Sequence, residues 1–425
     1  MAEACNEVRR IGEVIRRARV LQGRSQREIA TALGYHQSKV SRLESGRGTE
    51  DIRVLRAVAQ ELGIPSEQLG LAAAPDRAAP GPGPGVKEMH RRTFLAAGVA
   101  AFVPLPESVT AHDELVRALL PGLLPAAAAA PLDTAVLRDR LGAARRLFYT
   151  CDYTALERML PGLIADLRQA AGDVGARDAL SPLLATAYQT ATSLLLKQHD
   201  QGTAWFAVGR AMAEAERSGD PLILASSVRV QAHVLAREKH TAQAVALVRH
   251  AADQLTGSYD RRSPEYLAAV GLLLLRGVTA ASSGGDRAAT AVFLSEAKEV
   301  ARYVCVDRPD AWANFDSTNV ALHEVSALVT FGDVDRALQA AHPLMRRHIP
   351  VPERRAALWL DVARAHSRQG RLADGYRALR IAEACAAQDV RRPAVRDLVA
   401  DMAARDRRRT LPELHQFSRR LGVPA

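Results

Sequence analysis

Residues 25–46 read SQREIATALGYHQSKVSRLESG, and they determine how the N-terminal part of the chain folds. Ser25 with Glu28 three residues later is the pattern of a capping box, which starts a helix. Gly34 suits the left-handed conformation that ends one. A second short helix is expected over residues 36–45. Apolar residues recur at helical spacing on the inner face of both segments: Ile29, Ala30, Leu33, Val40 and Leu43. The stretch therefore predicts two short helices joined by a tight turn.

The start of the second helix is polar and basic, with the residues His36, Gln37, Ser38, Lys39, Ser41 and Arg42. Side chains at the start of such a helix can reach base edges in the major groove of DNA. An ordinary helical hairpin with a solvated polar face would show the same local pattern. The flanking segments decide between these two interpretations.

Amphipathic helices are expected on both sides of the hairpin. A basic one spans residues 8–21, another spans residues 51–62, and a last short turn begins at Ser66. Five helices in this order resemble the lambda-repressor-like, xenobiotic-response-element family of bacterial DNA-binding domains. The segments IGEVIRRAR, SQREIATALGYHQSKVSRLESG and LRAVAQELGI carry the resemblance. The resemblance covers roughly the first seventy residues.

The resemblance implies a role for each residue of the hairpin. Gln26 would touch a phosphate and brace the recognition helix, while Gln37 and Ser38 would read base edges. Glu44 would support the fold rather than face DNA. The remaining candidates would read bases or hold the backbone, with His36 also forming the turn and Arg47 placed for a phosphate: His36, Lys39, Ser41, Arg42 and Arg47.

Charge and composition agree with a polyanionic partner. The net charge is +10 and the pI is near 9.8, which favours nucleic acid. Aromatic residues make up only 4% of the chain, which argues against a base-stacking platform for single strands. A single domain of this kind presents little surface, so we expect a homodimer on double-stranded DNA with a near-palindromic operator.

A Pro/Gly-rich segment, AAAPDRAAPGPGPG at residues 72–85, is expected to be a linker. The apolar run at residues 94–105 follows Arg91 and Arg92 and resembles an export signal. However, it is internal and too short to span a bilayer. We therefore interpret residues 72–110 as a linker with a short docking segment, and expect no membrane association.

From residue 111 to residue 425 the sequence predicts helix after helix, with hairpin joins near residues 150, 197, 237, 284, 331 and 369. The spacing of these joins falls near that of helical repeats. The pattern resembles tetratricopeptide repeats. Small residues would let paired helices approach closely: Ala204, Ala244, Ala288 and Ala337. Stacked hairpins share a continuous core and curl into an α-solenoid with a concave groove.

The groove would bind a signalling peptide, a small ligand or a partner protein. Polar residues among small apolar ones mark its candidate lining: Gln189, Arg229, Gln231, His233, Asn319 and His323. An Asn amide both donates and accepts, so it can clamp a peptide backbone. The alternative is a plain scaffold that only dimerises the DNA-binding domains.

No constellation in the sequence supports catalysis. Phosphate-cradling glycine loops, nucleophile elbows and zinc-protease motifs are all missing. The cysteines, Cys5, Cys151, Cys305 and Cys385, are too far apart for a metal site or a disulfide framework. We expect no enzyme activity, no cofactor and no metal, and a reducing cytoplasm.

The sequence therefore predicts an all-α protein with a five-helix DNA-binding domain (1–71), a linker (72–110) and a repeat domain (111–425) for sensing and dimerisation. This combination resembles bacterial transcriptional regulators whose repeats sense a peptide, including the multi-repeat regulators of actinobacteria. The alternative function is a protein-interaction adaptor that recruits a partner through the repeat groove.

Overall fold

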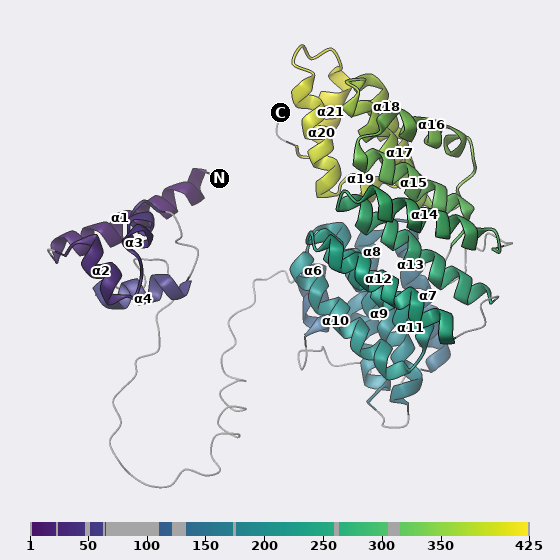
Figure 1. The fold of residues 1–425 in the computed structure, drawn as a ribbon, viewed down its shortest axis with the longest axis horizontal. Coiled ribbons are helices and arrows are strands. Elements are labelled where there is room, and N and C mark those ends of the chain that lie inside the picture. The colour runs from purple at the N-terminus through teal and green to yellow at the C-terminus, as the bar shows by residue number, and fades with distance from the viewer. Residues whose placement is uncertain are drawn as a thin grey trace, which may run out of the picture. The chain divides into compact units, whose positions relative to one another are not determined.

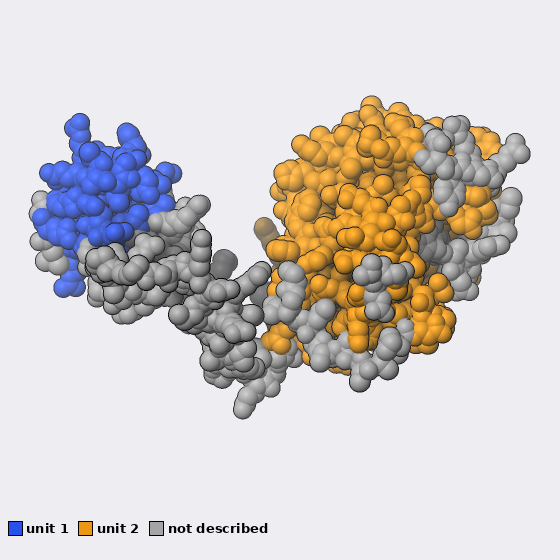
Figure 2. Space-filling model, turned by 90° about the horizontal axis from the view of Figure 1, so that it is seen from below, with its two compact units in different colours: residues 1–102 blue, residues 103–425 orange. Residues whose placement is uncertain are grey.

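The protein is described here from a computed structural model. It describes residues 2–22, 24–46, 52–62, 64, 110–120, 133–172, 176–258, 263–304 and 315–423. These ranges contain helices and no strand, which confirms the all-α prediction. The chain divides into two compact units, residues 1–102 and 103–425 (Figure 2). This division falls inside the predicted linker. Residues 72–109 of that linker, and the turn expected at Ser66, lie outside the described residues.

Unit 1 consists of α1 (Ala2–Leu21), α2 (Gln26–Ala32), α3 (Gln37–Glu44) and α4 (Ile52–Leu62). The predicted hairpin is present, with its second helix beginning one residue later than expected because His36 is the N-cap. The capping box is confirmed: Ser25 Oγ accepts from the Glu28 amide at 3.2 Å, and the Ser25 amide donates to Glu28 Oε2 at 2.6 Å. The core of unit 1 contains residues from all four helices, among them Ile15, Ile29, Val40, Leu43 and Val58.

Two glycines shape this unit. Gly34 has φ +68°, as predicted, and ends α2. Gly12 lies where α1 crosses the end of α3. A Cβ at Gly12 would come within 2.7 Å of the main-chain oxygen of Glu44 and the main-chain nitrogen of Gly46. Only glycine therefore allows α1 to approach the end of α3 this closely.

Unit 2 is built mainly of antiparallel helical hairpins in chain order (Figure 1). Its helices are α6 (Ala111–Leu119), α7 (Thr134–Tyr149), α8 (Tyr153–Ala170), α9 (Arg177–Gln198), α10 (Gln201–Ser218), α11 (Pro221–Arg237), α12 (Thr241–Ser258), α13 (Pro264–Ser283), α14 (Arg287–Ala301), α15 (Ser317–Phe331), α16 (Val334–Met345), α17 (Pro352–Arg368), α18 (Leu372–Cys385), α19 (Ala387–Val390), α20 (Pro393–Arg405) and α21 (Pro412–Arg420). This stack confirms the predicted helical solenoid.

The same turn joins the two helices of each hairpin from α7–α8 to α17–α18. One residue has a positive φ, and the amide of the next residue donates to a carbonyl five residues earlier at 2.9–3.0 Å. This is the Schellman arrangement that closes a helix. The positive-φ residues are Cys151, His199, Lys239, Gly285, Gly332 and Gly370. The shared geometry shows that the hairpins are repeats of one structural unit.

A buried residue of each second helix lies five positions after the positive-φ residue; in α8 it is Leu156, and in later hairpins it is smaller. Ala204, Ala244 and Ala337 occupy this position and are buried, as predicted. In α14 the prediction of Ala288 is wrong, because Ala288 is exposed and Thr290 is the buried equivalent. The turn before α14 contains two adjacent glycines, and the second, Gly285, has the positive φ, so the buried position falls at Thr290.

Helix α13 is the one described helix that is long and apolar enough to cross a bilayer. However, 72% of its most apolar stretch is buried inside the unit. It contacts α11, α12, α14 and α15. Its apolarity is therefore that of a central core helix.

The first helices of the hairpins form a closed ring. Each of α7, α9, α11, α13, α15 and α17 contacts the next, and α17 returns to contact α7. The second helices, α8 to α18, alternate with these along the chain and each contacts its hairpin partner. The buried cluster of the early helices also includes Ala356 of α17 and Ala386. The predicted open groove is therefore closed by contact between the beginning and the end of the solenoid.

A buried ionic cluster lies at this closure. Lys197 Nζ of α9 lies 2.6 Å from Glu353 Oε1 of α17 and 3.2 Å from Asp389 Oδ1 of α19. Asp389 also accepts from the Tyr153 hydroxyl at 2.7 Å and pairs with Arg392 at 2.7 Å. Burial alone would disfavour every charge here. The ion pairs nevertheless hold the pKa of each carboxyl below its ordinary value and that of Lys197 above its ordinary value.

We predict that Lys197→Met destabilises unit 2 by about 3 kcal/mol, because it leaves the Glu353 carboxylate without its cation and the buried Asp389 with Arg392 alone. Lys298→Met is the matched control, since Lys298 pairs with Glu324 at the surface and is half exposed, and exposed pairs contribute little. Urea unfolding followed by circular dichroism measures both. Equal unfolding midpoints for the two variants would contradict a role for the cluster in closing the ring.

Candidate nucleic-acid interface and central cavity

The outer face of α3 carries most of the predicted DNA contacts. Gln37, Ser38, Ser41 and Arg42 are exposed, whereas Val40 and Leu43 point into the core. Positions i, i+1, i+4 and i+5 share one side of a helix. The four side chains therefore form a single polar stripe, and we call it the α3 stripe.

Two further candidates lie at the edge of this stripe. His36 caps α3, with its Nδ1 accepting from the Ser38 amide at 3.3 Å and lying 2.9 Å from Ser38 Oγ. Lys39 lies beside the stripe, with its ammonium 3.8 Å from the centre of the Tyr35 ring. The role proposed for His36 in forming the turn matches its position. Lys39 is oriented by a cation–π contact rather than by the core.

The buried side chain of Glu44, at the end of α3, links α3 to α1 and α2 through hydrogen bonds. Its carboxylate accepts from Gln26 Nε2 at 2.7 Å and from Arg19 Nη2 at 3.0 Å, and its side chain is only 5% exposed. Burial alone would raise the pKa of Glu44, but the hydrogen bonds from Arg19 and Gln26 hold it below its ordinary value. Gln26 thus braces α3 at the first turn of α2. Arg47 lies outside the described residues.

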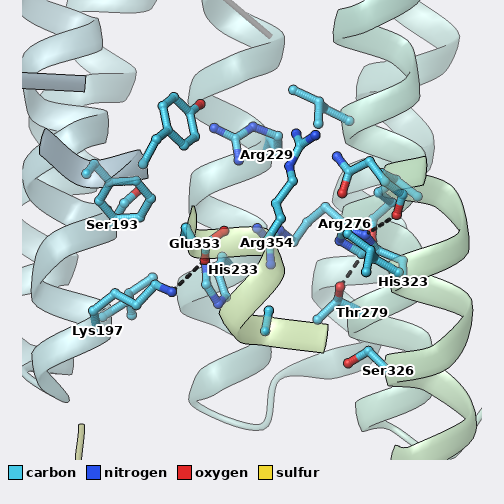
Figure 3. Close-up of a pocket in the computed structure, with 18 of the residues that line it drawn as sticks. Ser193, Lys197, Arg229, His233, Arg276, Thr279, His323, Ser326, Glu353 and Arg354 are labelled. Carbon is cyan, nitrogen blue, oxygen red and sulfur yellow. Dashed lines mark hydrogen bonds and ion pairs between the residues drawn. The ribbon is translucent and has the colours of Figure 1, made fainter. Parts of the chain in front are cut away.

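A cavity of about 410 Å³ lies inside the ring of unit 2. Its walls come from all six ring helices, together with Arg392. Figure 3 shows Lys197, Arg229, Arg276 and Arg354 reaching it from α9, α11, α13 and α17. Because the ring is closed, residues from the two ends of the solenoid line the same space.

The structure places five of the six predicted lining residues in the cavity wall: Gln189, Arg229, His233, Asn319 and His323. Gln231 is not in this wall, and its prediction is wrong. The residues of α11 that line the cavity are Ser226, Arg229, His233 and Arg237. A residue two positions after Arg229 points to the opposite side of a helix.

Gln189 is already engaged within the protein. Its amide donates to Ser227 Oγ and accepts from Ser226 Oγ, both at 2.8 Å. Both ends of the side chain therefore hold α9 to α11, so Gln189 shapes the cavity wall and has its hydrogen bonds within the protein.

Asp316 caps α15, because its carboxylate accepts a hydrogen bond from the main-chain amide of Asn319 at 2.6 Å.

The cavity is strongly positive, and the sequence analysis did not predict this charge. Among the described residues, eight cationic side chains line it against two carboxylates, Glu353 and Asp361. The cations are Arg145, Lys197, Arg229, Arg237, Arg276, Arg354, Arg364 and Arg392. One signal was available. Arg276 interrupts the apolar run GLLLLRGV in a core helix, and a charged residue at such a position requires a reason.

Burial in the cavity wall lowers the pKa of Arg276, His323 and His233. Burial, together with the charge of Arg229, lowers the pKa of Arg276 to about 9. Burial lowers the pKa of His323 to about 4, with Arg276 and Arg354 acting in the same direction against a hydrogen bond to the Asn319 carbonyl. The pKa of His233 is also well below its ordinary value, through burial and the surrounding cations. Both histidines are therefore neutral at pH 7.

Comparison with known families applies to unit 1. Residues 15–69 match the helix-turn-helix family model. This match supports a DNA-binding transcriptional regulator, and the α3 stripe lies inside it. No curated protein and no solved structure matches the chain. Within the described residues, no group of three His, Cys, Asp or Glu side chains could hold a metal ion.

We predict that Glu44→Gln destabilises unit 1 by about 2 kcal/mol at pH 7, because it removes the charge from hydrogen bonds with Arg19 and Gln26. Since the pKa of Glu44 is lower in the folded chain, its contribution is complete above the ordinary glutamate value of about 4.3. That contribution is lost as the pH falls through the folded value. The deficit of the variant should therefore shrink at acidic pH.

Hydrogen exchange of α1 and α3 in the full chain, followed by mass spectrometry, measures this deficit. Glu61→Gln is the control in the same unit, because Glu61 pairs with Arg24 at 2.7 Å with both side chains about 30% exposed. Faster exchange in both variants to the same extent would refute the bracing role of Glu44.

Proposed function

We propose that this protein is a sequence-specific DNA-binding transcriptional regulator. The observation that supports this best is the α3 stripe of Gln37, Ser38, Ser41 and Arg42, which is exposed on the second helix of a helix-turn-helix unit. Gln can bond adenine through two hydrogen bonds, and Arg can do the same to guanine. Gln26, His36, Lys39 and Arg47 complete the proposed interface and hold the DNA backbone.

Two copies of unit 1 would act together on a near-palindromic operator in the cytoplasm. Recognition helices of this kind read half-sites about one helical turn apart, so a homodimer is part of the proposal. Unit 2 would dimerise the chain and sense a ligand in its cavity. A ligand can change DNA binding only to the extent that it binds two forms of the protein with different affinity.

We predict that Gln37→Ala and Arg42→Ala each weaken operator binding by about 1–3 kcal/mol, because each removes a base-edge contact. The operator is first obtained by mapping the genomic sites that the full chain binds, and affinities are then measured over a range of salt. Binding should fall steeply with salt. Arg302→Ala removes the same charge from the C-cap of α14 in unit 2, where the side chain of Arg302 is 74% exposed, and should leave affinity unchanged.

The mass of the protein–operator complex is read in the same experiment. Two chains on one operator are expected, and a single chain would rule out the dimer. If the α3 variants bind like the wild type, or the chain captures a stoichiometric protein partner without selecting any DNA, the adaptor function replaces the regulator.

A further inference from the structure

The cavity in unit 2 collects more positive charge than its own carboxylates can balance. Four of its eight cations nevertheless pair with a carboxylate. Lys197 pairs with Glu353 and Asp389, Arg364 pairs with Asp361, and Arg392 pairs with Asp389. Arg354 pairs with Asp316 at 3.3 Å. The carboxylates of this region are thereby committed to other cations.

Arg229 and Arg276 differ from these cations. Within the part of the chain that the structure describes, neither forms an ion pair, and the Nε of each is buried without a hydrogen-bond partner. They come from adjacent ring helices, α11 and α13, and both reach the cavity (Figure 3). The charge of each also lowers the pKa of nearby His233. An uncompensated cation in such a place is costly unless an anion accompanies it.

We propose that this cavity binds a small organic anion that carries a phosphate or carboxylate group, with Arg229 and Arg276 as its charge partners. Guanidinium groups suit both anions, since their planar N–H groups match two oxygens at once. The size of the cavity, about 410 Å³, falls in the range of about 300–1,000 Å³ that small molecules occupy. A metabolite therefore fits better than an extended peptide or a partner helix.

The remaining wall suits the organic part of such a molecule. Phe148 of α7 and Leu272 and Leu275 of α13 supply apolar surface. His323 is neutral, and its Nδ1 donates a hydrogen bond to the Asn319 main-chain carbonyl at 2.9 Å. Its other ring nitrogen, Nε2, is the one that adds to the polar part of the wall. Pockets for small ligands commonly combine apolar walls with a few polar groups that orient the ligand.

The inference deepens the proposed function, since it names the class of ligand that unit 2 would sense. Only the effector role rests on DNA binding. Anion binding itself rests on the cavity and is measured without DNA.

The test uses isothermal titration calorimetry on the full chain without DNA, in chloride buffer at constant ionic strength. Three probes are titrated: inorganic phosphate, pyrophosphate and citrate. We expect saturable binding of at least one probe, with one anion per chain. Arg229→Gln and Arg276→Gln should each raise its Kd by about tenfold or more, because each removes a charge-assisted contact. Preference for pyrophosphate over citrate identifies a phosphate ligand, and the reverse preference identifies a carboxylate.

Arg355→Gln is the matched control. Arg355 lies in α17 with its Nε also buried and without a partner, but it is not in the cavity wall. It should leave the Kd unchanged. The two cavity variants remove an unbalanced charge, so they should fold, and thermal unfolding checks this. Arg229→Lys, which keeps the charge, should retain part of the affinity.

Two results overturn the inference: no saturable binding of any probe, or equal Kd values for the wild type and both cavity variants, which means an adventitious ion only. Loss of operator binding in the α3 variants is independent of these results. If no anion binds but operator binding is intact, only the anion-binding inference is rejected. If an anion binds but the chain selects no operator, only the proposed regulator function is rejected.

Discussion

Closure of the inner helix ring is the constraint on which unit 2 depends. The Lys197 cluster joins α9 to α17 and α19, across more than 150 positions of sequence. An ion pair this buried needs hydrogen bonds to every charged atom to offset desolvation, and Tyr153 and Arg392 supply them around Asp389. Without closure, α7 and α17 would border open solvent. With closure, their side chains face one another across the cavity, and the arginines of different ring helices share one space.

The repeat architecture was largely predictable because it is local. Gly285, Gly332 and Gly370 mark helix ends where a left-handed residue is needed, and Asp152, Asp200 and Asp286 follow such ends as N-caps. Both signals are readable from neighbouring residues. Cys151, His199 and Lys239 occupy the same left-handed position without being glycine. No composition rule identifies them, since tertiary packing offsets their backbone strain.

The DNA-binding unit was predictable at the level of individual residues because its elements are short and strongly capped. Ser25, Glu28 and Gly34 follow from spacing along two adjacent helices, and the inward position of Glu44 was implied by the family resemblance. The cavity was not predictable in this way. Gln189, Asn319 and His323 were found because polar residues stood out among small apolar ones. Gln231 shared that pattern but faces away, and Glu353 and Arg392 reach the cavity only through ring closure, which no single helix encodes.

Closure and cavity charge are coupled physically. Ring closure brings Lys197, Arg229 and Arg276 into one low-dielectric space, where like charges repel more strongly than in water. This repulsion therefore offsets part of the stabilisation that the ion pairs of Lys197 give to the closed ring. An anion between the two unpaired arginines would remove that repulsion, so occupancy and closure would stabilise each other. The same anion would gain less from an open ring, where water already screens the arginines. This difference in affinity between two forms is what a ligand requires in order to act as a signal.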